Sequence, residues 1–172
     1  MDRQPTLRPR DVAVALQLAW GPGSHYAVLA QALLLGLAEV HRGVRRLEAA
    51  GLLLAGERRV NRQALLEFLV HGVRYVFPAV LGREATGLPT AAGGPGLAGK
   101  LPAAPAVVWP TPDGKARGVA LTPLYRAAPR ASLQDERLYR ALALVDVLRL
   151  GQIQERRQAQ GLLDAELSAT AR

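Results

Sequence analysis

A stretch of 27 residues, from Val12 to Ala38, contains no aspartate, glutamate, lysine or arginine. An uncharged stretch of this length either crosses a membrane or is buried in a protein core. The turn sequence Gly21-Pro22-Gly23-Ser24 divides it into two parts, each too short to span a bilayer as a helix. Residues 1–10 also lack the apolar segment of a signal peptide. We therefore predict two buried helices in a cytoplasmic protein that is not inserted in a membrane.

The composition excludes several kinds of site and favours a polyanionic partner. There is no cysteine, so disulfides, thiolate metal sites and cysteine nucleophiles are excluded. The formal net charge is +8, from 22 basic and 14 acidic residues. Residues 1–62 and 63–131 are each net basic, whereas residues 132–172 carry equal numbers of basic and acidic side chains. The positive field favours nucleic acid as a partner, and by charge the C-terminal range does not contribute to such a surface.

Three short helices are predicted near the N-terminus. The first spans Pro9–Trp20, because proline favours the first helical turn and the glycines of the turn sequence end the helix. The second runs over His25–Leu33, with Ser24 as its N-cap residue. The third runs over Leu37–Ala50, and Gly51 is expected to end it in a left-handed backbone conformation.

A short hairpin and a fourth helix are predicted next. Residues 52–60 combine an apolar run, the turn Ala55-Gly56-Glu57 and a basic return segment, which is typical of a β-hairpin. Asn61 is a suitable N-cap residue for a helix that reaches about Phe77. Apolar residues cover most of this helix, so we expect it to be buried on several sides.

The next region, residues 81–131, is rich in proline and glycine and is predicted to consist mainly of loops. One ordered part is expected within it. Val107–Trp109 and Arg117–Leu121 are separated by the turn signal Asp113-Gly114, a combination that predicts a β-hairpin.

Residues 132–172 are predicted to form a C-terminal helical region. Ser132 is expected to cap a helix over Leu133–Leu150, and a more polar helix is expected over Gln152–Leu167. The predicted fold class is therefore mainly α with a small β component.

The segment Leu29–Leu53, LAQALLLGLAEVHRGVRRLEAAGLL, carries the strongest pattern in the chain. A Leu-Ala pair precedes a tight turn, a helix with spaced valines and an Arg-Leu pair follows, and Gly-Leu-Leu leads into the hairpin. This pattern resembles the winged helix-turn-helix of MarR-type bacterial transcriptional regulators. The resemblance covers about Pro9–Phe77 and implies a sequence-specific regulator that binds double-stranded DNA through a winged domain in residues 1–80.

Two positions depart from that family's pattern. Leu34 stands where glycine is usual in the turn, and Gly36 stands where serine is usual as the cap of the recognition helix. Glycine is an acceptable N-cap residue, but a leucine with a positive φ angle would be strained. The conformation of the turn is therefore left open.

The third predicted helix has two different faces on a helical wheel. One face is apolar and is predicted to lie in the core, through Leu37, Val40, Val44 and Leu47. The other is predicted to contact bases or phosphates in the major groove, through Ala38, His41, Arg42 and Arg45, with Arg46 on its flank. The alternative interpretation is the solvated face of a core helix.

Basic residues outside this helix are predicted to add backbone contacts. Arg58 and Arg59 of the hairpin, which would be the wing, are expected to reach phosphate or the minor groove. Arg8 and Arg10 lie near the first helix and could add phosphate contacts, although a purely solvated role is equally consistent with their position.

Several signals for enzymatic chemistry fail in context. The segment Gly94–Leu101 matches G-x-G-x-x-G, but Leu101 replaces the hydroxyl residue of a phosphate loop and two prolines follow it. His25, His41 and His71 lie far apart in sequence, so a metal site is not expected. No serine, histidine and carboxylate arrangement is present. Asp146 and Arg149, three residues apart, are interpreted as a simple helix pair. We predict no catalytic residues, no cofactor and no enzymatic activity.

The predicted partner is double-stranded DNA, bound by a homodimer whose contacts come from the fourth helix and the helix over Leu133–Leu150. A protein-interaction or antitoxin-like module, with the winged domain docked on a protein, is the alternative, supported by the neutral C-terminal region. RNA binding is disfavoured because few aromatic residues are available for base stacking. A small-molecule effector or a partner protein is left open.

Overall fold

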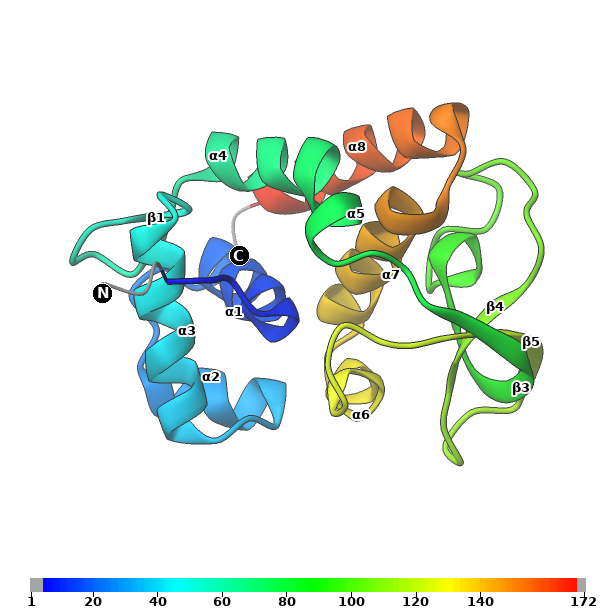
Figure 1. The fold of residues 1–172 in the computed structure, drawn as a ribbon, viewed down its shortest axis with the longest axis horizontal. Helices are drawn as coiled ribbons and strands as arrows, with labels where there is room; N and C mark the ends of the chain where they lie inside the picture. The colour runs from blue at the N-terminus through cyan, green and yellow to red at the C-terminus, as the bar shows by residue number, and fades with distance from the viewer. Residues whose placement is uncertain (1–4, 170–172) are drawn as a thin grey trace.

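The computed structural model describes residues 5–169, which form a mainly α-helical structure with a small β component (Figure 1). The elements are α1 (Pro9–Trp20), α2 (Tyr26–Leu33), α3 (Leu37–Ala49), β1 (Leu53–Leu54), β2 (Arg59–Val60), α4 (Arg62–Glu67), the π-helical η1 (Phe68–Gly72), α5 (Val73–Val76), β3 (Leu81–Thr90), the 3₁₀ turn η2 (Ala91–Gly93), β4 (Val107–Pro110), β5 (Ala116–Leu121), α6 (Ala128–Gln134), α7 (Glu136–Leu150) and α8 (Ile153–Ser168). Within residues 5–169, no single helix is long and apolar enough to cross a membrane; α2 and α3 reach that threshold only as a pair, bent by 107°.

The first three helices and the hairpin confirm the predicted element order. Helix α1 has the predicted bounds, and α3 ends one residue before the predicted limit, followed by Gly51 with a φ angle of +74°. The predicted cap of α2 is wrong, because the N-cap residue is His25 and the Ser24 hydroxyl donates to the Gly21 carbonyl at 2.6 Å. Three residues, Leu34 to Gly36, join α2 to α3.

Leu34 adopts the left-handed conformation that the sequence made questionable, with φ +54° and ψ +42°. Its N–H lies close to the carbonyl oxygens of Ala30 and Gln31, so it ends α2 in the way a glycine usually does. A branched side chain in this conformation costs on the order of 1 kcal/mol, which glycine does not incur. The chain therefore contains local strain at the turn that leads into α3.

We expect Leu34→Gly to be more stable than Leu34→Ala by about 1 kcal/mol, because only glycine tolerates a positive φ without strain. Both variants lose the leucine side chain beyond Cβ, so their difference comes mainly from the backbone conformation. At Gln31, an exposed right-handed position of α2, the order should be reversed by about 1 kcal/mol. Urea unfolding followed by circular dichroism measures both pairs. An alanine variant that is the more stable at both positions would contradict the left-handed turn.

The fourth predicted helix is confirmed as a continuous helical segment made of α4, η1 and α5. The prediction that it is buried on several sides is wrong, because its buried residues, Leu65, Leu69 and Val73, lie on one face. The Asn61 side chain caps it as predicted, because its Oδ1 atom accepts from the Ala64 N–H at 3.2 Å. Its middle turn is π-helical, a feature that the hydrophobic pattern did not indicate.

The predicted hairpin between residues 107 and 121 is wrong. Strands β4 and β5 run parallel to each other, and each pairs antiparallel with β3, so the three strands close on themselves. Two glycines permit this tight closure: a Cβ atom at Gly87 would overlap the Trp109 carbonyl, and one at Gly114 would overlap the backbone of Gly87. The ten-residue strand β3 lies in residues 81–131, so the prediction that this region consists mainly of loops is wrong for its first part.

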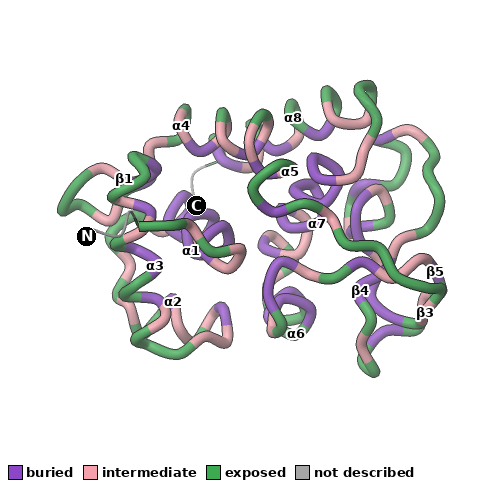
Figure 2. Tube along the Cα trace, viewed as in Figure 1, coloured by how far each residue is buried: buried purple, intermediate pink, exposed green. Residues whose placement is uncertain are grey.

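Helix α7 is the centre of the molecule. Every residue from Ala141 to Arg149 is buried, by α1, α5, α6, α8 and η2 (Figure 2). Its N-cap residue is Asp135, whose carboxylate accepts from the N–H groups of Arg137 and Leu138, so the predicted cap Ser132 is wrong; Ser132 lies inside α6. Residues 141–149 are enclosed by their own chain and offer no free surface, so a dimer contact in the predicted range 133–150 is left to its two ends.

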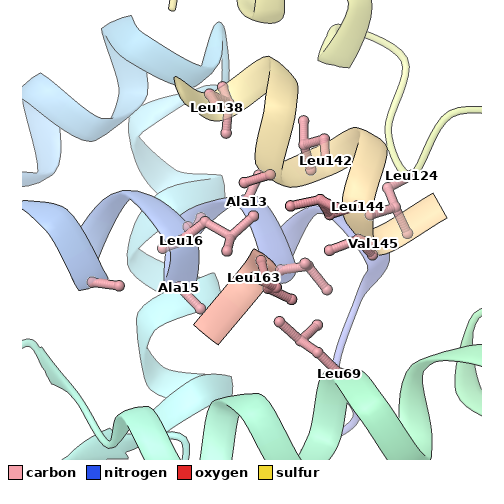
Figure 3. Close-up of a cluster of buried hydrophobic side chains, with 14 of the residues drawn as sticks. Ala13, Ala15, Leu16, Leu69, Leu124, Leu138, Leu142, Leu144, Val145 and Leu163 are labelled. Atoms are coloured by element: carbon pink, nitrogen blue, oxygen red, sulfur yellow. The ribbon is translucent and has the colours of Figure 1, made fainter. Parts of the chain in front are cut away.

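One hydrophobic core joins the N-terminal helices to the C-terminal helices (Figure 3). Leu16 of α1, Leu142 of α7 and Leu163 of α8 meet in it. Polar contacts cross the same boundary: the Gln17 amide donates to Asp135 at 2.8 Å, and the Trp20 indole donates to the Glu166 carbonyl at 3.0 Å. The three-helix unit that carries α3 therefore packs against the rest of the chain through both apolar and polar contacts.

Candidate nucleic-acid interface

The outward face of α3 is open to solvent. Four of the predicted contact residues are exposed, namely Ala38, His41, Arg42 and Arg45. The inward face is buried through Val40, Gly43, Val44 and Leu47. Leu37, predicted to lie in the core, is instead 51 % exposed, because the first turn of α3 extends beyond the edge of the core. The structure thus brings a polar, basic face and a short apolar start together at the N-terminal half of one helix.

Arg42 and Arg45 carry the free positive charge of this face. Within residues 5–169, neither guanidinium makes an ion pair or a hydrogen bond. An exposed guanidinium offers five N–H donors in a planar fork that matches two acceptors at once. The face can therefore bind a phosphate or the edge of a guanine without first breaking an internal contact.

His41 and the hairpin are linked through Tyr26 of α2. The His41 and Tyr26 rings stack with their centroids 3.7 Å apart, and the Arg58 guanidinium lies 5.0 Å from the centroid of the same tyrosine ring. Arg58 also donates to the Ser24 carbonyl at 3.1 Å. Half-buried Arg58 therefore holds the hairpin against α2, and we assign it to positioning, whereas sequence analysis predicted a DNA contact.

Arg59, the second predicted contact residue of the hairpin, is exposed. It makes a 3.0 Å ion pair with Glu57, and both side chains are more than half exposed. Such surface pairs contribute little and exchange readily for another anion. Arg59 is therefore available for contact at the tip of the β1–β2 hairpin.

Arg46 is not available in the same way. Its guanidinium donates two hydrogen bonds to Asp11 of α1, from Nε to Oδ2 and from Nη2 to Oδ1, each at 2.7 Å. Asp11 is buried and also accepts the Arg8 N–H at 2.8 Å, so it caps α1 while holding α3. The hydrogen bonds that the guanidinium donates to Asp11 raise the pKa of Arg46. We therefore assign Arg46 to the packing of α3 on α1, and not to DNA contact as predicted from the helical wheel.

The two arginines near the start of α1, Arg8 and Arg10, differ in exposure and in their ion pairs. Arg8 is exposed, whereas Arg10 makes a 2.9 Å ion pair with Glu39 on α3. The pair lies beside the first turn of α3. Arg10 therefore contributes to the position of α3 as well as to the local charge.

A buried polar network outside this surface was missed. The Asp146 carboxylate accepts from Thr90 Oγ1 at 2.7 Å, Trp109 Nε1 at 2.8 Å and Arg149 Nη1 at 2.8 Å. Arg149 also donates to the carbonyls of Phe77 and Pro78, at 2.9 and 3.2 Å. Burial raises the pKa of Asp146, and the three donors oppose that rise. The network joins the end of α5, β3, β4 and α7. The predicted simple pair of Asp146 and Arg149 is therefore the centre of a buried network that holds these elements together, and we call this pair the clamp.

Other polar candidates also serve the packing of the chain. The glycine-rich segment Gly94–Leu101 lies against α7, with Leu97 buried and Gly94 close to Ala143. The Tyr139 hydroxyl donates to the Pro89 carbonyl at 2.6 Å, and burial raises the pKa of Tyr139 to about 12. In the part of the chain that the structure describes, no group of three or more histidine or acidic side chains could hold a metal ion.

No protein-family model, no curated protein and no solved structure matches this chain. The assignment of a function therefore depends on the exposed arginines of α3 and on the elements that hold them.

Proposed function

We propose that this chain is a sequence-specific regulator that binds double-stranded DNA, with α1, α2, α3 and the β1–β2 hairpin acting as a winged helix-turn-helix. Two helices at 107°, joined by three residues, fall within the range of helix-turn-helix motifs. The hairpin follows α3 at the position of a wing. The single observation that carries the proposal is the open face of α3, on which Arg42 and Arg45 have no partner among residues 5–169.

The dimensions of α3 fit a major groove. Its 13 residues make it about 20 Å long, and a helix with side chains is about 10–12 Å across, against a groove about 12 Å wide. Arginine is the commonest side chain to bind guanine bidentately, and Ala38 can contact a thymine methyl group. We infer that Arg42 and Arg45 read bases, with Arg59 on a flanking phosphate.

We further propose that the protein acts as a homodimer on two half-sites. A single helix-turn-helix unit reads few base pairs, and dimers place two units about 34 Å apart, one turn of DNA. Of the two predicted contact regions, the fourth helix presents two adjacent exposed apolar side chains, Tyr75 at 76 % and Val76 at 50 %, whereas the other presents Leu133 alone, at 53 %. The selected DNA sites are therefore expected to be inverted repeats.

We expect Arg42→Ala and Arg45→Ala each to weaken binding to a selected duplex by about 5- to 150-fold for each half-site, which corresponds to the loss of one bidentate base contact in each subunit. Selection of bound sequences from random duplex DNA, followed by fluorescence anisotropy, measures the loss. Each variant should also relax the base preference at one position of each half-site.

The matched control is Arg157→Ala, which removes one exposed positive charge from α8. Its affinity should stay close to that of the wild type. Affinity that is unaffected by both α3 substitutions would refute α3 as the recognition helix. If no sequence is enriched, and binding to a protein partner is instead insensitive to salt, the protein-interaction alternative would replace the DNA proposal.

A further inference from the structure

A pocket of about 530 Å³ lies beside the first turn of α3. One wall comes from α1, the α2–α3 turn and Glu39 of α3, and the other from residues 125–130, at the start of α6. This second wall belongs to the region after residue 80, to which the proposed function gives no role. The pocket therefore joins the proposed DNA-reading helix to the other half of the chain.

The pocket is strongly basic. Arg10, Arg126 and Arg130 line it, and the lining contains one acidic residue, Glu39. Glu39 is paired with Arg10, at 2.9 Å. Arg126 and Arg130 are exposed, and neither makes an ion pair with any residue from 5 to 169. Two unneutralised guanidiniums at one opening favour an anion.

The pocket wall also contains two unsatisfied hydrogen-bond donors. The Arg10 Nε and the Tyr125 hydroxyl are buried and have no hydrogen-bond partner within the described chain. Tyr125 is only 8 % exposed, and its burial raises the pKa of the phenol, so the hydroxyl keeps its proton. Buried polar groups are nearly always paired, so each of these donors requires an explanation, and a bound anion would supply one. Both donors belong to residues that line the same basic pocket.

The position of the pocket indicates where the anion comes from. Glu39 and His41 are two residues apart on α3, so they lie about 200° apart around the helix. The hairpin and α2 flank α3 on the His41 side, and the pocket flanks it on the Glu39 side. Because a helix nearly fills a major groove, elements on its two flanks face the two phosphate backbones.

We propose that the pocket formed by Arg10, Tyr125, Arg126 and Arg130 binds backbone phosphate of the DNA duplex, so that both halves of the chain hold the DNA. The inference rests on the proposed function. The same anion chemistry could be supplied by a free phosphate, and the experiment separates the two sources.

The test compares Arg126→Ala/Arg130→Ala with Arg83→Ala/Arg117→Ala. The control pair removes the same charge from β3 and β5, at the opposite end of the molecule from α3 (Figure 1). Affinity for a selected duplex is measured against potassium chloride concentration. Loss of two phosphate contacts in each subunit, and therefore of four in the proposed homodimer, should reduce the slope of log K against log salt by about 3.6, because each contact contributes about 0.9. The control slope and the base preference of both variants should not change.

A second arm titrates inorganic phosphate into the wild type and the Arg126→Ala/Arg130→Ala variant by calorimetry. An unchanged DNA slope in that variant would overturn the proposal while leaving the proposed function intact. If the variant loses saturable phosphate binding but keeps the wild-type salt dependence of DNA affinity, the pocket binds a free anion. That result would also overturn the proposal. A wild type that binds no duplex would refute the proposed function and this inference together.

Discussion

Replacement of Arg149 by methionine should lower the free energy of unfolding by about 3–5 kcal/mol, because it leaves the buried Asp146 carboxylate without its cation. Asp146 and Arg149 are 1 % and 7 % exposed, so water cannot reach the Asp146 carboxylate to solvate it after the guanidinium is removed. Two backbone carbonyls, of Phe77 and Pro78, lose their donor as well. Methionine keeps most of the buried volume, which limits the contribution from a cavity. Equilibrium urea unfolding measures the effect.

The loss should depend on pH in a defined direction. Arg149 lowers the pKa of Asp146 and burial raises it, so removing Arg149 raises the folded-state pKa further above its unfolded value. Between these two pKa values the native variant binds more protons than the unfolded chain. Its free energy of unfolding therefore falls as pH rises from the unfolded-state pKa to the folded-state pKa of Asp146. The deficit relative to the wild type should therefore be largest near pH 8 and smaller near pH 5.

Two controls make this result specific to the clamp. Arg157→Met removes an exposed arginine from α8 and should change the stability by less than about 0.5 kcal/mol. Asp146→Asn/Arg149→Met removes the titrating group, so the extra pH dependence should disappear. A deficit in Arg149→Met that is the same at both pH values, or below about 1 kcal/mol, would show that the carboxylate is not held by Arg149.

The helices of this chain could be predicted because their limits are encoded locally. Pro9 at the start of α1, Asn61 before α4 and Gly51 after α3 act within one turn of the helix that they limit. The faces of α3 followed in the same way from residue spacing. Of its four predicted core residues only Leu37 is misplaced, because spacing does not show where the core ends.

The strands could not be predicted in the same way, because their partners are distant in sequence. The Asp113-Gly114 turn predicts that β4 and β5 pair with each other, and local sequence offers no competing signal. Both instead pair antiparallel with β3, more than 15 residues before β4, and they pair with each other only in parallel. Strand β3 itself contains two glycines and a proline, residues that disfavour a strand when they are judged locally.

Side-chain partners across helices were missed for the same reason. The helical wheel places Arg46 beside the exposed face of α3, but it does not show that Asp11 lies opposite, 35 residues earlier. Asp146 and Arg149 have the spacing of a surface pair, and this spacing does not show that Thr90 of β3 and Trp109 of β4 donate to the carboxylate in the folded chain. Residues 125–130 gave no signal, because their relation to α3 exists only in the folded chain.

Arg45 and Arg46, adjacent in sequence, should therefore give opposite results when each is replaced by alanine. Arg46→Ala should lower the free energy of unfolding by about 3 kcal/mol, because Asp11 is buried and loses both hydrogen bonds from the guanidinium. In a chain of this length, that corresponds to a fall in melting temperature of about 6–12 °C. Arg45→Ala should leave the stability within about 0.5 kcal/mol, because its side chain has no partner among the described residues.

DNA binding should separate the same two variants in the reverse order. Measured by anisotropy well below either melting temperature, Arg45→Ala should lose base preference, while Arg46→Ala should keep the wild-type preference because its side chain faces α1 and not the groove. Asp11→Ala should reproduce the stability loss of Arg46→Ala, and the double substitution should cost less than the sum of the two, as expected for a coupled pair. If Arg46→Ala alters the base preference and leaves the stability unchanged, Arg46 contacts DNA from the exposed face of α3. That result would refute the role of the Arg46–Asp11 pair in holding α3 on α1.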